Sequence, residues 1–243
     1  MKQNSKLIQQ GAEAKIFLNE KENLITKDRI PKSYRIPEID KTIIKRRTKA
    51  EKKILEKASK IIPAPNPLPL KEFNKIEMPF IDGKKISQNL DNFPLNEQKK
   101  IMKLIGENTA KLHNADIIHG DLTTSNMILV EENSDDEKLN QKEVITSLAS
   151  SKGRGRSGSS GGALPSKKIF FIDFGLGFIS KKTEDKAVDI HLLKQALEAK
   201  HFAHWKTLFE EFSKSYEKTL GKEESKKVFE RLTAIERRGR YRH

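Results

Sequence analysis

The stretch that decides the fold is IIHGDLTTSNMILV, residues 117–130. An apolar pair leads into the tripeptide HGD, a short polar loop follows, and an apolar strand begins after it. Such a loop can turn a carboxylate, Asp121, and an amide, Asn126, toward a common cleft. A second carboxylate, Asp173, follows an apolar run in IFFIDFG, residues 169–175. Either stretch alone could be a solvated turn between strands, but the two in this order indicate a catalytic site.

Together, these stretches resemble the catalytic and metal-binding loops of the protein kinases. In such a site Asp121 accepts or orients the proton of the acceptor hydroxyl. Asn126 and Asp173 supply hard oxygen ligands, which suit Mg²⁺ shared with the phosphates of ATP. We expect His119 to pack under the loop rather than to act as a base. Asp189 could anchor the backbone of the catalytic loop, or it could be an ordinary helix N-cap.

The chain has 243 residues, enough to bury a core as one large domain or two small lobes. Hydrophobic residues make up 35% and charged residues 34%, so the core must be concentrated in a few periodic segments. The absence of cysteine excludes disulfides and thiolate zinc sites. The apolar runs are far shorter than the roughly 20 residues that span a bilayer, and the first residues contain no signal-peptide core. We therefore expect a soluble intracellular protein with no membrane association; the expected location is the cytoplasm and nucleus.

The formal net charge is +14, from 48 basic and 34 acidic residues. This excess favours a polyanionic partner, nucleic acid first, through phosphate contacts that do not depend on sequence. The alternative is a lysine-rich surface that only reflects the composition of the source organism. The chain ends in a basic tail, RRGRYRH, at residues 237–243. The charge thus agrees with a nucleic-acid partner but does not identify one.

The first part of the chain predicts the nucleotide-binding half of the site. Residues 7–18 indicate two strands joined by a turn. The expected nucleotide loop is made of Gln10, Gly11, Ala12, Glu13 and Ala14. Lys27, at the end of a short third strand, is placed to reach the α and β phosphates. A helix is predicted from Asp40, and Glu51 beside its apolar face could pair with Lys27. The ordinary alternatives are a lysine like many others in this chain and a glutamate paired with a solvated neighbour.

The segment after this helix predicts where two lobes meet. A proline-rich connector ends the helix, and KIEMPFIDG, residues 75–83, reads as a strand that runs into a turn. We expect Met78 and Ile81 in this segment to contact the nucleotide. The expected fold class is α+β, a minimal bilobal protein-kinase-like fold. A small β-rich N-lobe covers residues 1–82, and a mainly helical C-lobe covers residues 83–243.

The C-lobe is expected to consist mainly of helices. Asn96 is expected to cap a helix that leads to the catalytic stretch, and further helices are predicted over 187–199, over 202–216 and around 228–235. Between about 131 and 168 the sequence is acidic and then low-complexity, with no periodic apolar face, which predicts disorder. This insert separates two strands that otherwise indicate a hairpin, where a long insertion is tolerated. Its GRGR part could touch RNA phosphates, but a tolerated insertion is the better interpretation.

Several positions depart from the general kinase pattern. The nucleotide loop has one glycine instead of three. Gly120 stands where most kinases have the arginine that reads activation-loop phosphorylation, and Thr123 replaces the usual catalytic-loop lysine. No Ala-Pro-Glu motif follows, and residues 175–189 are too few for a standard peptide-binding platform. The pattern predicts a minimal, atypical kinase that is slow on peptides. Aminoglycoside-type phosphotransferases also use an HGD loop, but the TTSN continuation argues against a small-molecule kinase.

One family shares these departures. The motifs that carry the resemblance are QGAEA at 10–14, KSYRIP at 32–37, HGDLTTSN at 119–126, IDFGL at 172–176 and EDKAVD at 184–189. On these motifs the sequence resembles the PRPK family, the small atypical kinases of the KEOPS (EKC) complex. The resemblance covers nearly the whole chain apart from the insert.

The resemblance implies a set of partners and cofactors. A tRNA threonylcarbamoyl-transferase subunit would bind the C-lobe, a further small subunit would bind the N-lobe, and tRNA would be contacted through the complex and the basic tail. The complex makes threonylcarbamoyladenosine next to the anticodon of tRNAs that read codons starting with A. With ATP and Mg²⁺ bound, the kinase fold would act largely as an ATPase, with Ser/Thr phosphorylation as an accompanying activity. The alternative is a non-catalytic module that binds tRNA and scaffolds the same assembly.

Overall fold

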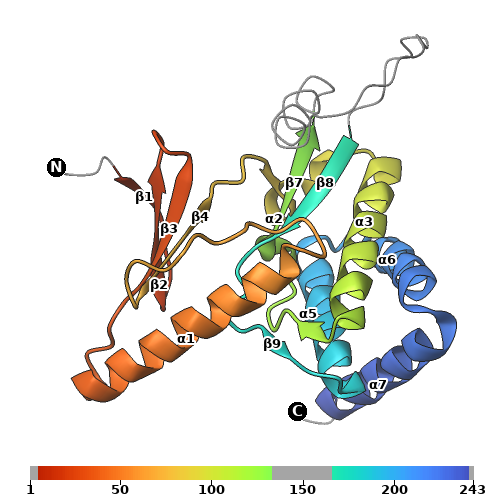
Figure 1. Cartoon of the computed structure of the whole chain (residues 1–243). Coiled ribbons are helices and arrows are strands. Elements are labelled where there is room, and N and C mark those ends of the chain that lie inside the picture. Colours follow the sequence, from red (N-terminus) through yellow and green to blue (C-terminus); the bar gives the residue numbers. More distant parts are fainter. Residues whose placement is uncertain (1–4, 133–165, 241–243) are drawn as a thin grey trace, which may run out of the picture.

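The computed structural model describes residues 5–132 and 166–240 of the chain. A β-sheet and one long helix form the first part, and a bundle of helices with short strands forms the second (Figure 1). This order gives the α+β arrangement that the sequence predicts.

The sheet of the first part is antiparallel, and its strands lie in sequence order: β1, Ser5–Gln10; β2, Ala14–Asn19; β3, Leu24–Arg29; and β4, Lys75–Pro79. β1 and β2 form the predicted hairpin, which is closed by a hydrogen bond from Gly11 N to Ala14 O (2.9 Å). Lys27 lies within β3, between Ile16 and Ile76 of the neighbouring strands, and not at the end of its strand. Strands on both sides therefore fix the backbone that carries this lysine.

Helix α1, Pro37–Ala58, follows the third strand and ends toward the helical part of the molecule (Figure 1). It begins three residues before Asp40, the predicted start. A proline fits the first turn of a helix because the N–H group that it lacks would have no partner there. Ile54 and Leu55 on the inner face of α1 are buried in the core, and Glu51 is buried beside them.

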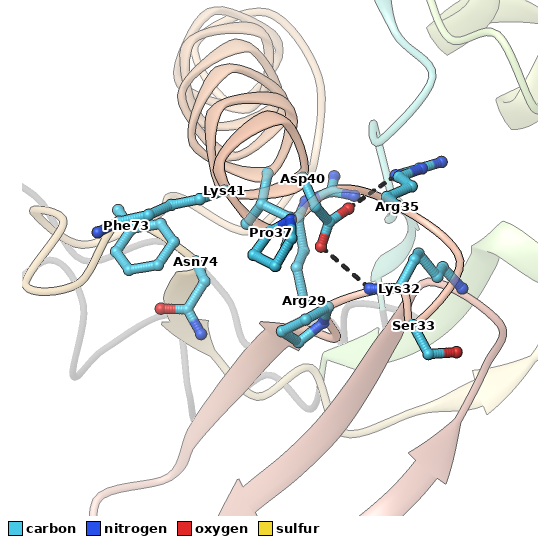
Figure 2. A pocket seen from close by; sticks show the side chains of 11 residues that line it. Arg29, Lys32, Ser33, Arg35, Pro37, Asp40, Lys41, Phe73 and Asn74 are labelled. Carbon is cyan, nitrogen blue, oxygen red and sulfur yellow. Dashed lines mark hydrogen bonds and ion pairs between the residues drawn. The ribbon is translucent and has the colours of Figure 1, made fainter.

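A cavity of about 590 Å³ lies at the start of α1 (Figure 2). On one side of it, the buried Asp40 accepts a hydrogen bond from Lys32 N (3.0 Å) and one from Arg35 Nη1 (3.0 Å). The aromatic ring of Phe73 lies on the other side, under the Lys41 ammonium at 5.5 Å. Asp40 thus secures the KSYR loop against the helix and does not serve as a helix cap.

The second part contains these elements: β5, Lys84–Lys85; α2, Ile86–Asn89; η1, Leu90–Asn92; α3, Leu95–Asn114; β6, Ile117–Ile118; η2, Thr124–Asn126; β7, Met127–Glu132; β8, Ser166–Phe171; β9, Phe178–Ile179; α5, Thr183–Lys200; α6, Trp205–Leu220; and α7, Lys222–Arg240. β7 pairs with β5 and β8 in one small sheet, and β6 pairs with β9 in another. The second pairing ties the segment before the HGD loop to the segment after Asp-Phe-Gly.

The hairpin expected on either side of the insert is confirmed by the pairing of β7 with β8. The insert was expected from about 131 to 168, and the two strands continue past these bounds at both ends. Glu131 and Glu132 pair with Lys167 and Ser166, which continues the ladder past the point where the apolar pattern stops. The rest of the insert, 133–165, lies outside the described residues.

Other helix ends also differ from the prediction. α3 begins at Leu95 after Pro94, so Asn96 lies inside its first turn and is not the cap; Leu95 packs against the core. α5 starts at Thr183, earlier than predicted. Phe202, expected on a helix, is 76% exposed in the link before α6. α5 ends before it, and the buried His201 that follows α5 pairs with Asp91 (Nδ1 to Oδ2, 2.9 Å).

One buried cluster joins both parts of the molecule, from Leu55 on α1 to Leu232 on α7. The aromatic stripe of α6 belongs to it as predicted, since Phe212 and Tyr216 are fully buried. The basic tail is not separate from the last helix, because α7 continues through residues 237–240; residues 241–243 lie outside the described part. Within the described ranges, none of the helices has both the length and the apolar character needed to cross a bilayer.

Candidate functional site

A cavity of about 570 Å³ lies between the first sheet, α1 and the catalytic loop. Eleven of the twelve site residues expected from the sequence line it: Gly11, Ala12, Glu13, Ala14, Lys27, Glu51, Met78, Ile81, Asp121, Asn126 and Asp173. Gln10 is the exception, because it is exposed on β1 while its neighbours Ile8 and Gln9 line the cavity. Residues about 160 positions apart in the sequence thus face one space.

Lys27 is the centre of the charged wall of this cavity. Its Nζ atom donates to Glu51 Oε1 (2.7 Å) on α1 and to Asp173 Oδ1 (2.6 Å) of the Asp-Phe-Gly segment. Lys27 and Glu51 are buried, whereas the Asp173 side chain keeps 49% of its surface exposed. The expected pairing of Lys27 with Glu51 is therefore confirmed, and Asp173 joins it.

The charges of Lys27 and Asp173 each favour the ionised form of the other group. Burial by itself would lower the pKa of Lys27, but the nearby Glu51 and Asp173 carboxylates outweigh it and raise that pKa. For Asp173, burial would raise the pKa, yet the attraction of Lys27 and the hydrogen bonds it receives lower it. Both groups consequently stay ionised at neutral pH, as phosphate and metal binding requires.

Arg29 is a charged residue of this site that sequence reasoning missed. Its Nη2 donates to Glu51 Oε2 (2.5 Å), so the two oxygens of Glu51 are held by two different cations. Its Nη1 lies 3.5 Å from Glu13 Oε2, and Arg47 Nη1 donates to the other oxygen of Glu13 (2.7 Å). This network ties the nucleotide loop to α1. The signal was present, since residues two apart on a strand, such as Lys27 and Arg29, share one face.

The catalytic loop brings Asp121 and Asn126 together, as predicted. Asn126 Nδ2 donates to Asp121 Oδ2 (2.8 Å) and to the Asp121 carbonyl oxygen (3.0 Å). The Asn126 carbonyl accepts from Ile172 N (2.9 Å), which places Asn126 beside the strand that leads to Asp173. Because Nδ2 is engaged, Oδ1 is the atom of Asn126 that could hold a cation. An amide oxygen next to the carboxylate of Asp173 is a donor set that fits Mg²⁺.

Two backbone conformations shape the site, one in the Asp-Phe-Gly segment and one in the catalytic loop. Asp173 has φ = 61°, a left-handed conformation that costs a non-glycine residue of order 1–3 kcal/mol. A hydrogen bond from Gly175 N to Asp173 Oδ1 (3.2 Å) stabilises it. Gly120 has φ = 79°, and a Cβ atom there would collide with the carbonyl of Leu176. This close approach explains why glycine, not arginine, stands at this position.

Asp189 anchors the loop from below, in agreement with the first of the two predictions for it. Asp189 Oδ2 accepts from His119 N (2.7 Å), and Oδ1 accepts from Gly120 N (2.8 Å). The alternative of a helix N-cap is wrong, because α5 begins six residues earlier. His119 is buried against Phe174, with ring centroids 4.5 Å apart, and burial lowers the pKa of its imidazole. His119 is therefore a neutral packing residue, as expected.

Two solved structures share this architecture. The Rio2 kinase of Chaetomium thermophilum, in its ADP/Mg²⁺-phosphoaspartate complex, superposes with a TM-score of 0.51 at 14% identity, over 96% of this chain and 70% of its own. WaaP, in complex with acyl carrier protein, gives a TM-score of 0.55 at 11% identity, over 97% and 87%. At such identities the likeness concerns the fold alone. The fold is that of a kinase-like protein, with an N-terminal sheet and a helical C-terminal part.

Sequence matches are more specific. The family model described as RIO domain matches residues 13–135. The KEOPS complex subunit Bud32 of Pyrococcus abyssi is 37% identical over 98% of this chain and 96% of its own length. The EKC/KEOPS complex subunit bud32 of Dictyostelium discoideum is 33% identical over 96% and 82%. The chain belongs to the Bud32/PRPK family, which confirms the resemblance seen in its motifs.

A third kind of relative is longer than this chain. A bifunctional tRNA threonylcarbamoyladenosine biosynthesis protein of Methanobrevibacter smithii is 36% identical over 98% of this chain. The chain spans only 37% of the length of that protein. A segment like the whole of this chain is therefore joined there, in one polypeptide, to a second and larger part.

Proposed function

We propose that this protein is the kinase-like subunit of a KEOPS complex and that it supports threonylcarbamoyladenosine formation in tRNA by processing ATP with Mg²⁺. The observation that carries the proposal is the cavity into which Lys27, Asp121, Asn126 and Asp173 all face. The names of the relatives from Pyrococcus abyssi and Dictyostelium discoideum support the KEOPS assignment. Residues 1–82 would form the nucleotide-holding lobe, and residues 83–243 the lobe that carries the catalytic loop.

In this proposal the two ends of the cavity have different tasks. The nucleotide loop, Met78 and Ile81 enclose the nucleotide. Lys27 exchanges Asp173 for phosphate oxygens, which leaves the Asp173 carboxylate for the metal. Glu51 and Arg29 keep the Lys27 ammonium in place during that exchange, because neither of them leaves the wall of the cavity.

The catalytic loop would handle the proton and the metal. Asn126 and Asp173 would hold Mg²⁺ through their oxygen atoms, and the metal would supply positive charge next to the transferred phosphoryl group. Asn126 Nδ2 holds one oxygen of Asp121, so the other oxygen is the one that can accept a proton from an acceptor hydroxyl or from water. The acceptor is then chosen by whatever approaches this loop, water for hydrolysis or a Ser/Thr hydroxyl for phosphorylation.

The fused relative supports a particular partner. In Methanobrevibacter smithii the corresponding segment and a larger part form one protein named for threonylcarbamoyladenosine biosynthesis. We therefore propose a tRNA threonylcarbamoyl-transferase subunit as the partner of the C-lobe, and a further small subunit for the N-lobe. The net charge of +14 supports contact with tRNA.

The competing proposal is a non-catalytic module that binds tRNA and scaffolds the complex. The exposed Arg237 and Arg238 at the end of α7 motivate it. Reconstituted tRNA modification separates the two proposals, with Asp121→Ala compared with deletion of residues 237–243. The catalytic proposal expects Asp121→Ala to abolish modification while complex assembly stays intact. If modification survives Asp121→Ala and only the deletion removes it, the scaffold proposal is correct.

A further inference from the structure

A buried chain of hydrogen bonds connects α6 to the catalytic loop. It begins at Tyr216 on α6, whose hydroxyl lies 2.8 Å from Nδ1 of His113 on α3. Nε2 of His113 lies 3.3 Å from Asp189 Oδ2, the oxygen that also accepts from His119 N. Tyr216, His113 and Asp189 are each no more than 1% exposed. The three side chains therefore act on one another without competition from bulk water.

The chemistry of the three groups fixes which atom donates. An ionised carboxylate can only accept, so His113 Nε2 must carry the hydrogen that faces Asp189. Burial raises the pKa of the Tyr216 hydroxyl, which therefore keeps its proton. If His113 also carried a hydrogen on Nδ1, the hydroxyl hydrogen of Tyr216 would have no acceptor. An unsatisfied donor in a fully buried place costs free energy. The arrangement that satisfies every group is Tyr216 O–H to Nδ1 and Nε2–H to Asp189.

The surroundings of Tyr216 fit a fixed donor. Its ring stacks on Phe212 with centroids 5.8 Å apart, and Phe229 of α7 meets it edge to face at 5.7 Å. The imidazole of His113 stands nearly perpendicular to it, at 80°. Aromatic rings from two helices thus set the direction in which the hydroxyl points.

We propose that Tyr216 is a positioning residue for the catalytic loop: its hydroxyl orients His113, and His113 holds the Asp189 carboxylate that binds the backbone of His119 and Gly120. The consequence for catalysis rests on the proposed function, since the loop carries Asp121. The tyrosine touches neither the cavity nor a reacting atom. It acts at a distance by keeping the imidazole from turning a C–H toward Asp189.

The test is Tyr216→Phe, which removes the hydroxyl and leaves the ring. Hydrogen exchange of the His119 and Gly120 amides is expected to become about fivefold faster, the factor that corresponds to loss of one hydrogen bond of about 1 kcal/mol. The His113 Nε2 proton, followed by nitrogen-15 NMR, is expected to exchange faster as well. Both measurements need no nucleotide, so they decide the proposal even if the protein turned over no ATP.

The matched control is Thr109→Val on the same helix as His113. It removes another buried hydroxyl, which donates to Ile105 O (2.8 Å), and leaves the hydrogen bonds between Tyr216, His113 and Asp189 in place. In an Asp189→Asn background, Tyr216→Phe should accelerate the loop amides no further. In ATP turnover Tyr216→Phe is expected to lower kcat about fivefold and to leave KM unchanged, while Thr109→Val changes neither. Equal acceleration of the loop amides by Tyr216→Phe and Thr109→Val would overturn the proposal.

Discussion

Replacing Glu51 by Gln should destabilise the protein far more than replacing other glutamates of the same helix. Glu51 is buried, and its two oxygens hold Lys27 at 2.7 Å and Arg29 at 2.5 Å. Glutamine keeps the shape but removes the charge, which leaves two buried cations with less compensation. Breaking a buried ion pair from one side costs about 3–5 kcal/mol.

The structure lowers the expected loss to the bottom of this range or just below it. Lys27 would retain Asp173, and Arg29 would retain Glu13 at 3.5 Å. We therefore expect a loss of about 2–3 kcal/mol in the free energy of unfolding, which corresponds to a decrease in Tm of roughly 4–12 °C for a chain of this size. Urea denaturation followed by circular dichroism measures the loss directly.

The matched control is Glu56→Gln, one and a half turns further along α1. Glu56 pairs with Lys52 at the surface and is 40% exposed, so its loss should cost about 0.5 kcal/mol or less. Raised salt should reduce the small loss of unfolding free energy caused by Glu56→Gln and leave most of the loss caused by Glu51→Gln. Equal unfolding free energies for Glu51→Gln and Glu56→Gln would refute the view that Glu51 is the buried hub of the charge network.

Two further predictions concern the loop backbone and the Asp-Phe-Gly segment. Gly120→Ala should cost about 2 kcal/mol or more in thermal unfolding, because it adds a collision with the carbonyl of Leu176 to the usual strain of about 1–2 kcal/mol at positive φ. Gly221→Ala, at φ = 100° and ψ = 148° in open space, should cost only the strain of that backbone region, of order 1–3 kcal/mol. A loss below about 1 kcal/mol for Gly120→Ala would contradict the predicted collision. Pairing with Lys27 lowers the pKa of Asp173 on folding despite its burial, so this group adds stability that is complete above the unfolded pKa and lost as pH falls through the folded one. The difference in unfolding free energy between wild type and Asp173→Asn should shrink as the pH drops below about 4. A difference that grew there would contradict this prediction.

The sequence predicts the site well where it depends on local motifs. The HGD loop and its Asn126 are contiguous, and the Asp-Phe-Gly segment ends the second strand of the predicted hairpin, so the two motifs already place Asp121, Asn126 and Asp173 near one another. Lys27 and Glu51 could be paired in advance because a strand followed by an amphipathic helix leaves few ways to bury both charges. The anchor role of Asp189 was one of two alternatives that its position offered, and its hydrogen bonds to His119 N and Gly120 N confirm it.

Other features depend on tertiary packing. Strand periodicity puts Arg29 on the same face as Lys27, but its place in the charge network depends on the second oxygen of Glu51, which comes from α1. Gln10 is carried out of the cavity by a register shift in β1 between Leu7 and Gln9. Asn96 loses the expected cap position because Leu95 already packs on the core, and Phe202 lies beyond the end of α5, next to the His201 that pairs with Asp91.

Whether this cavity processes ATP is decided by measuring ATP turnover with wild type and with Asp173→Ala. Both proteins are measured alone and with the partner subunits and tRNA, and Glu20→Ala, which removes an exposed carboxylate that does not line the cavity, serves as the control. Turnover is expected from wild type and Glu20→Ala, and a loss of at least tenfold from Asp173→Ala, a change of about 1.4 kcal/mol or more in transition-state stabilisation. Equal turnover by wild type and Asp173→Ala under every condition would contradict ATP processing by this cavity.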